Sequence, residues 1–259
     1  YRHATYSATD YYEEALCRDP GDVRNNNAMG LWLIRKGQFA KAEPYLRRAV
    51  KTLTEKNPNP YDGEPLYNLG LSLKYQGKTD EAYDYFYKAC WNAAWQDAGY
   101  YSLAQLSASK GNWEDALYEI DKSLLRNWHN LRGRHLKVVI LRHLGLVDEA
   151  LALIRESLAI DRFNFGCSFE EYLLTGEKAV LDDLLVRMRS EGHNYEELSL
   201  DYASAGCWEE ALKVVEVAFE SVVSERTLLY YYKSWFLLSL GRLKEAEMAI
   251  CVAERQPAD

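Results

Sequence analysis

Cysteine, proline and glycine are all scarce in this sequence, and each scarcity excludes a class of protein. The 5 cysteines are dispersed and form no Cys-x-x-Cys pair, which argues against a disulfide framework and against a zinc finger. Only 6 prolines and 15 glycines occur among 259 residues, whereas alanine and leucine are common. This composition favours helices over sheets.

An excess of positive charge and a long apolar run are also missing. The formal net charge is -8, so we expect no binding to nucleic acid or to anionic membranes. No segment is apolar over the length needed to span a bilayer, and no signal peptide is recognisable. We therefore expect a cytoplasmic protein. Because the chain begins with Tyr1 rather than with Met, we also expect it to be part of a longer protein.

Motifs of familiar catalytic chemistry are absent too. The sequence has no Walker loop, no dinucleotide-binding glycine fingerprint, no His-Glu-x-x-His and no Gly-x-Ser-x-Gly. His135 and His143 share one predicted helix, but their spacing corresponds to a rise of about 12 Å, which is too far for one metal ion. Cys207 and Cys251 occur at helical packing positions, where we interpret them as small buried hydrophobes. We predict no catalytic residue, no metal site and no cofactor.

The main positive feature of the sequence is a repeat centred on glycine. Seven of the 15 glycines recur at intervals of 30 to 40 residues, each between similar flanking residues. They are Gly37, Gly77, Gly111, Gly145, Gly176, Gly206 and Gly241. A glycine at a fixed place between two periodic apolar segments is typical of a helix that ends in the left-handed conformation.

Each glycine is followed by the packing pattern of a second helix. An alanine usually stands five residues after the glycine, a large apolar residue four further on and a small residue three beyond that, as in Ala82, Phe86 and Ala89. Offsets of four and three lie on one face of a helix. Paired acidic residues at the start of this helix, such as Glu209 and Glu210, fit the helix dipole better than acid–base catalysis. The repeating unit is therefore helix, glycine turn, helix.

This unit resembles the tetratricopeptide repeat. The resemblance is carried by Asn68-Leu69-Gly70, Tyr75, Gly77, Glu81-Ala82, Tyr85-Phe86 and Ala89. It implies an all-α fold, a right-handed superhelix of antiparallel helix pairs whose first helices line a concave groove. With it we expect seven helix pairs, one preceding helix within residues 4–18, and negligible β-structure. The stretch from Tyr83 to Leu125 also resembles the repeat region of large bacterial proteins with a carbohydrate-related β-domain upstream.

We expect a single solenoid over residues 1–259. It comprises a partial repeat at 1–22, regular repeats over 23–160, a degenerate repeat over 161–191 and C-terminal repeats over 192–259. The degenerate unit has Leu181 in place of the usual alanine and contains acidic residues, among them Glu170. No polar capping helix follows the last unit, so weak self-association through that flank is a further expectation.

The predicted binding site is the concave groove. Residues three and four apart on the first helices point the same way, which groups aromatic side chains of two units with basic side chains of a third. The predicted site consists of Tyr67, Leu71, Lys74, Tyr101, Gln105, Arg132, His135 and Arg142. Such a surface would accept an extended ligand with apolar side chains and one acidic group. The alternative is that the basic residues form a solvated helix face and the tyrosines pack between helices.

Two functions fit this sequence. One is a non-catalytic protein-interaction scaffold that holds a protein or peptide partner, or another domain of its own parent chain. The other is a carbohydrate-associated module of a larger bacterial carbohydrate-active protein. Because helical repeats carry unrelated functions on the same frame, the repeat alone does not choose between them.

Overall fold

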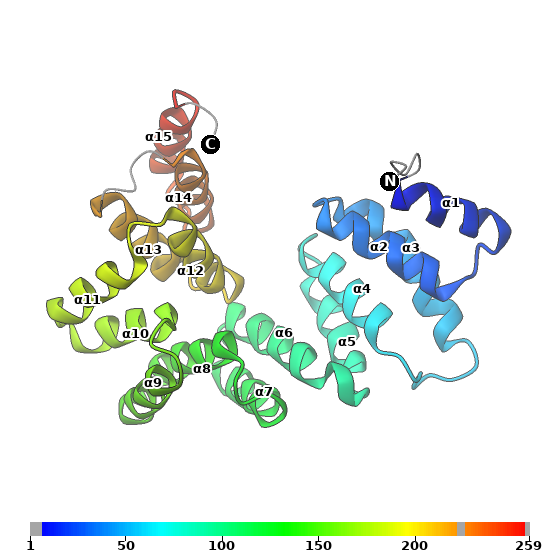
Figure 1. Ribbon diagram of the computed structural model, residues 1–259, viewed down its shortest axis with the longest axis horizontal. Helices are drawn as coiled ribbons and strands as arrows, with labels where there is room; N and C mark the ends of the chain where they lie inside the picture. The colour runs from blue at the N-terminus through cyan, green and yellow to red at the C-terminus, as the bar shows by residue number, and fades with distance from the viewer. Residues whose placement is uncertain (1–6, 222–225, 257–259) are drawn as a thin grey trace, which may run out of the picture. The chain divides into compact units, whose positions relative to one another are not determined.

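The computed structural model describes residues 7–221 and 226–256, and most of them lie in helices (Figure 1). The helices are α1 (Ala8–Arg18), α2 (Val23–Arg35), α3 (Phe39–Thr54), α4 (Glu64–Lys74), α5 (Thr79–Ala89), η1 (Ala93–Trp95), α6 (Gln96–Ser109), α7 (Trp113–Arg126), α8 (Leu131–His143), α9 (Val147–Ile160), α10 (Phe165–Thr175), α11 (Lys178–Met188), α12 (Gly192–Ser204), α13 (Trp208–Glu220), α14 (Thr227–Ser239) and α15 (Leu243–Ala253). No strand occurs within the described ranges, and none of their helices has the length and apolarity to cross a membrane.

The predicted element order is confirmed. Within residues 7–221 and 226–256, one N-terminal helix precedes seven helix pairs, α2–α3 to α14–α15. The first helix is described from Ala8 to Arg18, while residues 4–6 of the predicted range lie outside the described residues. The degenerate unit also forms a helix pair, α10–α11. The all-α fold class predicted from the repeat is therefore correct.

The repeat glycines end the first helices as predicted. All seven have φ between 69° and 76°, in the left-handed region that glycine occupies without a steric penalty. After each turn, the small and large packing residues are buried: Ala82, Phe86 and Ala89 are each 0% exposed. A Cβ on Gly70 would lie 2.7 Å from the Phe86 ring, so α4 and α5 approach closely only because this position is glycine.

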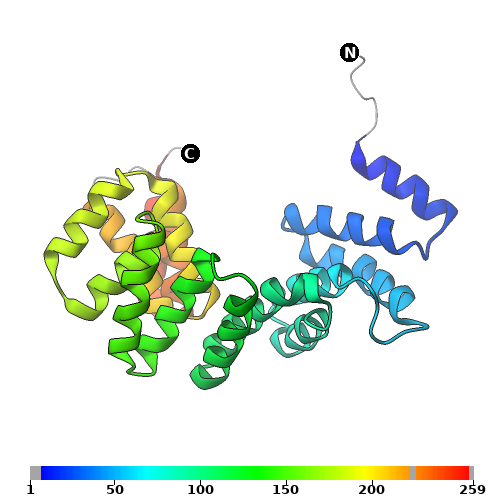
Figure 2. The same cartoon turned by 60° about the horizontal axis from the view of Figure 1, so that its bottom comes forward.

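The chain forms two compact units, Tyr1–Leu103 and Ala104–Asp259, and the division falls within α6. In unit 1, α1 packs on α2, and the pairs α2–α3 and α4–α5 follow one another (Figure 2). In unit 2, α8 packs against α7, α9 and α10, while α13 packs against α12 and α14. The predicted continuous solenoid over the whole chain stays a prediction.

Candidate functional site

Tyr67 of α4 belongs to an aromatic cluster inside unit 1. Its ring centroid lies 4.9 Å from that of Trp95 and 5.4 Å from that of Phe86. The Ser102 hydroxyl donates to the Tyr67 hydroxyl over 3.4 Å, and burial raises the pKa of Tyr67. The tyrosine therefore packs between helices and keeps only part of its surface for a ligand.

The other predicted site residues of unit 1 are also partly buried. Leu71, Lys74 and Tyr101 each retain an intermediate exposure. Burial lowers the pKa of the Lys74 ammonium to about 8, because the charged form loses part of its hydration. These three side chains combine aliphatic, aromatic and ammonium groups on the first helices of two repeats.

The remaining four predicted residues lie in unit 2, and their exposed fractions differ. Gln105 and His135 are 7% and 4% exposed, so both are buried. The side chain of Arg142 is 19% exposed, whereas that of Arg132 is 57% exposed. Arg132 is thus the member of this group with the most surface open to a partner.

Arg132 of α8 is bound to acidic residues of α12. Its guanidinium donates to the carboxylate of Glu197, and its Nε lies 3.4 Å from Oδ1 of Asp201. These groups and His135 help to line a cavity of about 170 Å³. Burial raises the pKa of Asp201 to about 6, although the charge of Arg132 opposes this shift.

His135 is enclosed rather than presented to solvent. Its ring meets Tyr202 edge to face, with centroids 4.8 Å apart. The ring also lies against α10, where a Cβ on Gly166 would be 2.3 Å from His135 Cγ. Burial and the charges of Arg142 and Arg132 lower the pKa of His135 to about 3. The imidazole is therefore neutral at physiological pH and does not contribute a positive charge.

Arg142 joins three other helices in one polar network. Its Nε donates to Glu170 of α10 over 2.7 Å, and one NH2 group donates to the same carboxylate over 3.3 Å and to Glu210 of α13 over 2.7 Å. The Tyr202 hydroxyl donates to Glu170 over 2.6 Å. Glu170 is 0% exposed, so the network neutralises a buried carboxylate. A ligand carboxylate at Arg142 would have to displace these partners.

These contacts show that α8 reaches α12 and α13, two repeats further along the chain. The face of α8 that the sequence predicts as basic is occupied by carboxylates from α10, α12 and α13. Sequence reasoning missed this neutralisation because the partners are 28 to 68 residues away. The acidic residues of the degenerate repeat were the available signal, since a buried carboxylate needs a cation.

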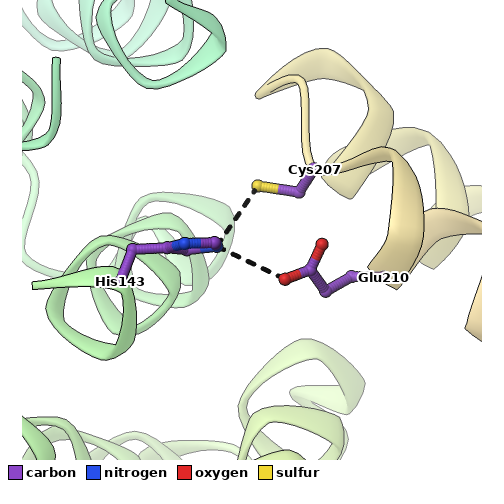
Figure 3. A group of neighbouring side chains, drawn as sticks. All are labelled: His143, Cys207 and Glu210. Atoms are coloured by element: carbon purple, nitrogen blue, oxygen red, sulfur yellow. Dashed lines mark hydrogen bonds and ion pairs between the residues drawn. The ribbon is translucent and has the colours of Figure 1, made fainter. Parts of the chain in front are cut away.

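A second side-chain group that the sequence does not predict adjoins this network. His143, Cys207 and Glu210 place one potential metal-ligand atom each within 4.8 Å of one another, as Figure 3 shows. Nε2 of His143 lies 4.0 Å from Sγ of Cys207 and 3.3 Å from Oε1 of Glu210. The His143 ring stacks on Trp113, with centroids 4.0 Å apart and planes 5° apart. Imidazole, thiol and carboxylate are the donor types that hold transition metals in proteins.

The two cysteines singled out in the sequence have different environments. Cys207 is 5% exposed and stands at the N-cap of α13, so its predicted burial is confirmed. Cys251 on α15 is exposed, and the interpretation of it as a buried hydrophobe is wrong. Helical periodicity placed it near packing positions, but the buried face of α15 is made by Ala246, Ala249 and Ala253.

Comparison with known proteins supports the repeat assignment. Residues 63–90 match the family model of the tetratricopeptide repeat. The structure is similar to a tetratricopeptide repeat protein from Parabacteroides merdae (TM-score 0.58, 19% identity, 92% of this chain and 94% of that one). It is also similar to YrrB, a tetratricopeptide repeat protein with an unusual peptide-binding site (TM-score 0.52, 15% identity, 90% and 97%). A third similar structure is yeast Tom70 (TM-score 0.58, 13% identity, 97% and 55%). At these identities, the likeness establishes the fold.

Proposed function

Because residues 63–90 match the tetratricopeptide repeat and the described chain consists of helix pairs, we propose that the protein is a non-catalytic protein-interaction scaffold. The observation that carries the proposal is the repeat itself, with residues 63–90 matching the family and the helix pairs extending over the described chain. The likeness to YrrB, which has a peptide-binding site, supports a peptide or partner segment as the ligand. Fold likeness alone does not identify that partner.

The proposed contact residues are the predicted ones that remain accessible, considered separately in each unit. In unit 1 these are Tyr67, Leu71, Lys74 and Tyr101, each of intermediate exposure. Their mixture of apolar and aromatic surface suits the side chains of an extended segment, and tyrosine contributes contact area at a small entropic cost. In unit 2, Arg132 is the accessible member, and it would exchange Glu197 for an acidic group of the partner.

The test begins with affinity capture by the full chain from lysate, followed by titration of synthetic segments of the captured protein. We expect Tyr101→Ala to weaken binding of the contacting segment by about 10-fold or more, as for an aromatic residue in the centre of an interface. Tyr87→Ala is the matched control, because Tyr87 is 50% exposed on α5, which is a second helix. Equal affinities of the Tyr101 and Tyr87 variants would remove this face of unit 1 from the proposal.

Arg132→Ala is measured with the same segments at low and high salt. If Arg132 receives an acidic group, the variant binds more weakly and loses part of its salt dependence. Titration with oligosaccharides, followed by tryptophan fluorescence, tests the alternative function. Saturable glycan binding by a chain that captures no protein would replace the scaffold proposal with the carbohydrate-associated module.

A further inference from the structure

We propose that His143, Cys207 and Glu210 bind a divalent transition-metal ion of the Zn²⁺ class where the end of α8 meets the start of α13. The three donors come from two segments of unit 2 that are 64 residues apart in sequence and converge on one point (Figure 3). This site is independent of the proposed scaffold function, because it involves none of the accessible contact residues named above.

The donor set selects the metal. Imidazole nitrogen and thiolate sulfur suit Zn²⁺ and Co²⁺, and the carboxylate supplies a third ligand accepted by both. Mg²⁺ and Ca²⁺ prefer sites made of oxygen atoms, so they fit poorly here. Three protein donors leave the fourth tetrahedral position for water or for a ligand from another molecule. The side chain of His143 is 28% exposed, which gives an ion access from solvent.

The geometry is close to what a tetrahedral ion requires. Bond lengths of about 2.0–2.3 Å put the donor atoms about 3.4–3.6 Å apart. The imidazole nitrogen is already 3.3 Å from the carboxylate and 4.0 Å from the sulfur, and no pair of donor atoms exceeds 4.8 Å. Shifts of the donor atoms by about 1 Å would bring these separations to the tetrahedral values. Stacking on Trp113 restricts the imidazole plane, as outer partners do around metal-bound histidines.

The nearby Arg142 does not prevent binding, because its charge is already balanced. Glu170 accepts two hydrogen bonds from that guanidinium, so Arg142 stays paired if Glu210 turns to a metal. Arg142 and His143 both contact Oε1 of Glu210, and the ion would replace the His143 contact, because Nε2 of His143 and the Glu210 carboxylate would then both bind the metal. When the ion binds, Cys207 loses its proton to solvent and becomes a thiolate. The thiolate and the two carboxylates then offset the guanidinium and the divalent ion.

A bound ion would tie α8 to α13 across the α10–α11 pair. The existing links between these elements are the hydrogen bonds and ion pairs made by Arg142 and His143. Coordination adds bonds that exist only in the folded state, so the metal stabilises unit 2 by mass action. The ion would therefore hold the repeats on either side of the degenerate unit at a fixed distance.

The experiment uses the full chain with Cys17 and Cys251 replaced by serine, because these two exposed thiols could bind metal elsewhere. Co²⁺ alone is the first probe, since a Co²⁺–thiolate bond gives a charge-transfer band and tetrahedral Co²⁺ gives visible bands. We expect both features to saturate at one ion per chain, and Zn²⁺ to abolish them by displacement. A parent protein without a thiolate band would overturn the proposal.

Three variants then test the ligands one at a time. Cys207→Ser is expected to abolish the charge-transfer band, while His143→Gln and Glu210→Gln weaken Co²⁺ binding by about 100-fold or more. His193→Gln is the matched control, because His193 lies on α12 in unit 2 with a side chain 70% exposed. Helicity is checked first by circular dichroism. A thiolate band that persists in Cys207→Ser would contradict the assignment.

A second readout does not depend on spectroscopy of the metal. Zn²⁺ is expected to raise the thermal unfolding midpoint of the parent protein, and the increase is expected to vanish in His143→Gln. This variant changes a side chain at a helix end that is partly open to solvent, so it should fold normally. An equal Zn²⁺-dependent increase in parent and variant would place the metal elsewhere on the chain.

Discussion

Glu43 in unit 1 and Glu170 in unit 2 each accept hydrogen bonds from several side chains. The two carboxylates differ in which repeats supply these donors. Glu43 accepts from Arg47 on its own helix, and from Gln76 and Lys78 in the segment that joins α4 to α5 in the next repeat. Glu170 accepts from Arg142 of the preceding repeat and from Tyr202 of the following one. The first carboxylate links neighbours along the array, whereas the second lies between two repeats that also contact each other.

The difference shows how a degenerate repeat is accommodated. Regular repeats pack through the small and large apolar residues of their second helices, so each unit needs mainly its immediate neighbours. Around α10 and α11, a buried ion network contributes as well, and Arg142 extends it to Glu210 in the repeat beyond. Stability in this part of unit 2 therefore depends on contacts distant in sequence, and substitutions there should behave less locally than those in unit 1.

The largest expected effect comes from removing the buried carboxylate. Glu170→Ala leaves the Tyr202 hydroxyl without an acceptor and Arg142 with only Glu210, so we expect a loss of about 3–5 kcal/mol in the unfolding free energy of unit 2. Glu43→Ala should cost about 1–2 kcal/mol, because its partners Arg47 and Lys78 are 38% and 46% exposed and can bind water. Urea unfolding followed by circular dichroism measures both. Equal losses would remove the distinction between the two carboxylates.

The turn glycines provide a second comparison. Gly77→Ala meets no atom within 4 Å and should cost about 1–2 kcal/mol for its positive φ alone. Gly206→Ala has the same conformational cost, and its Cβ would also lie 2.7 Å from the backbone Cα of Ser109. We expect about 1–3 kcal/mol more at this position, because α6 must shift to relieve the overlap. If both variants lose the same stability in thermal melts, the close approach of this turn to Ser109 is not maintained in solution.

The buried histidine makes the stability of unit 2 sensitive to acid. The pKa of His135 is about 3 in the folded state, against about 6.5 in an unfolded chain, so only the unfolded state takes up this proton between those values. Stability therefore falls as the pH falls through that window, by about 2 kcal/mol between pH 6.5 and 5. Asp201 acts in the opposite direction, since its raised pKa of about 6 lets the folded state hold a proton below that pH.

His135→Gln isolates the histidine contribution from that of Asp201. The difference in unfolding free energy between wild type and variant should change by about 2 kcal/mol between pH 6.5 and 5. His193→Gln is the control, because it removes a histidine whose side chain is 70% exposed rather than buried. A constant difference between wild type and the His135 variant across this range would mean that the imidazole becomes protonated within the fold.

The smallest effect on stability is expected at the exposed apolar residues of α15. Leu243 and Met248 are 60% and 61% exposed, and we expect them to mediate weak, concentration-dependent self-association. The double substitution Leu243→Glu with Met248→Glu should leave thermal stability nearly unchanged and abolish that association in sedimentation experiments. Val186→Glu, at a position 76% exposed on α11, should not abolish it. A strictly monomeric wild-type chain at high concentration would contradict the prediction.

The helices and turns were predictable because their determinants are local. A glycine with positive φ and apolar residues at offsets of four and three act within one helical hairpin, so they can be recognised without knowing the neighbours. The same local logic placed Glu210 in the first turn of α13, where its charge faces the helix dipole. It also assigned first-helix residues such as Arg132 and Arg142 to one face of α8.

The sequence by itself therefore determined the all-α repeat fold, the order of the helix pairs and the positions of their turns. Only the tertiary structure decided how the charged side chains are paired. Arg142 is bound to Glu210, 68 residues further along the chain, and Arg132 is bound to Glu197, 65 residues further along. Tertiary contact likewise brought His143 to Cys207, although no spacing rule connects two residues 64 positions apart. Helical periodicity sets which face of a helix a side chain occupies, but the partner of that face depends on how later repeats pack against it.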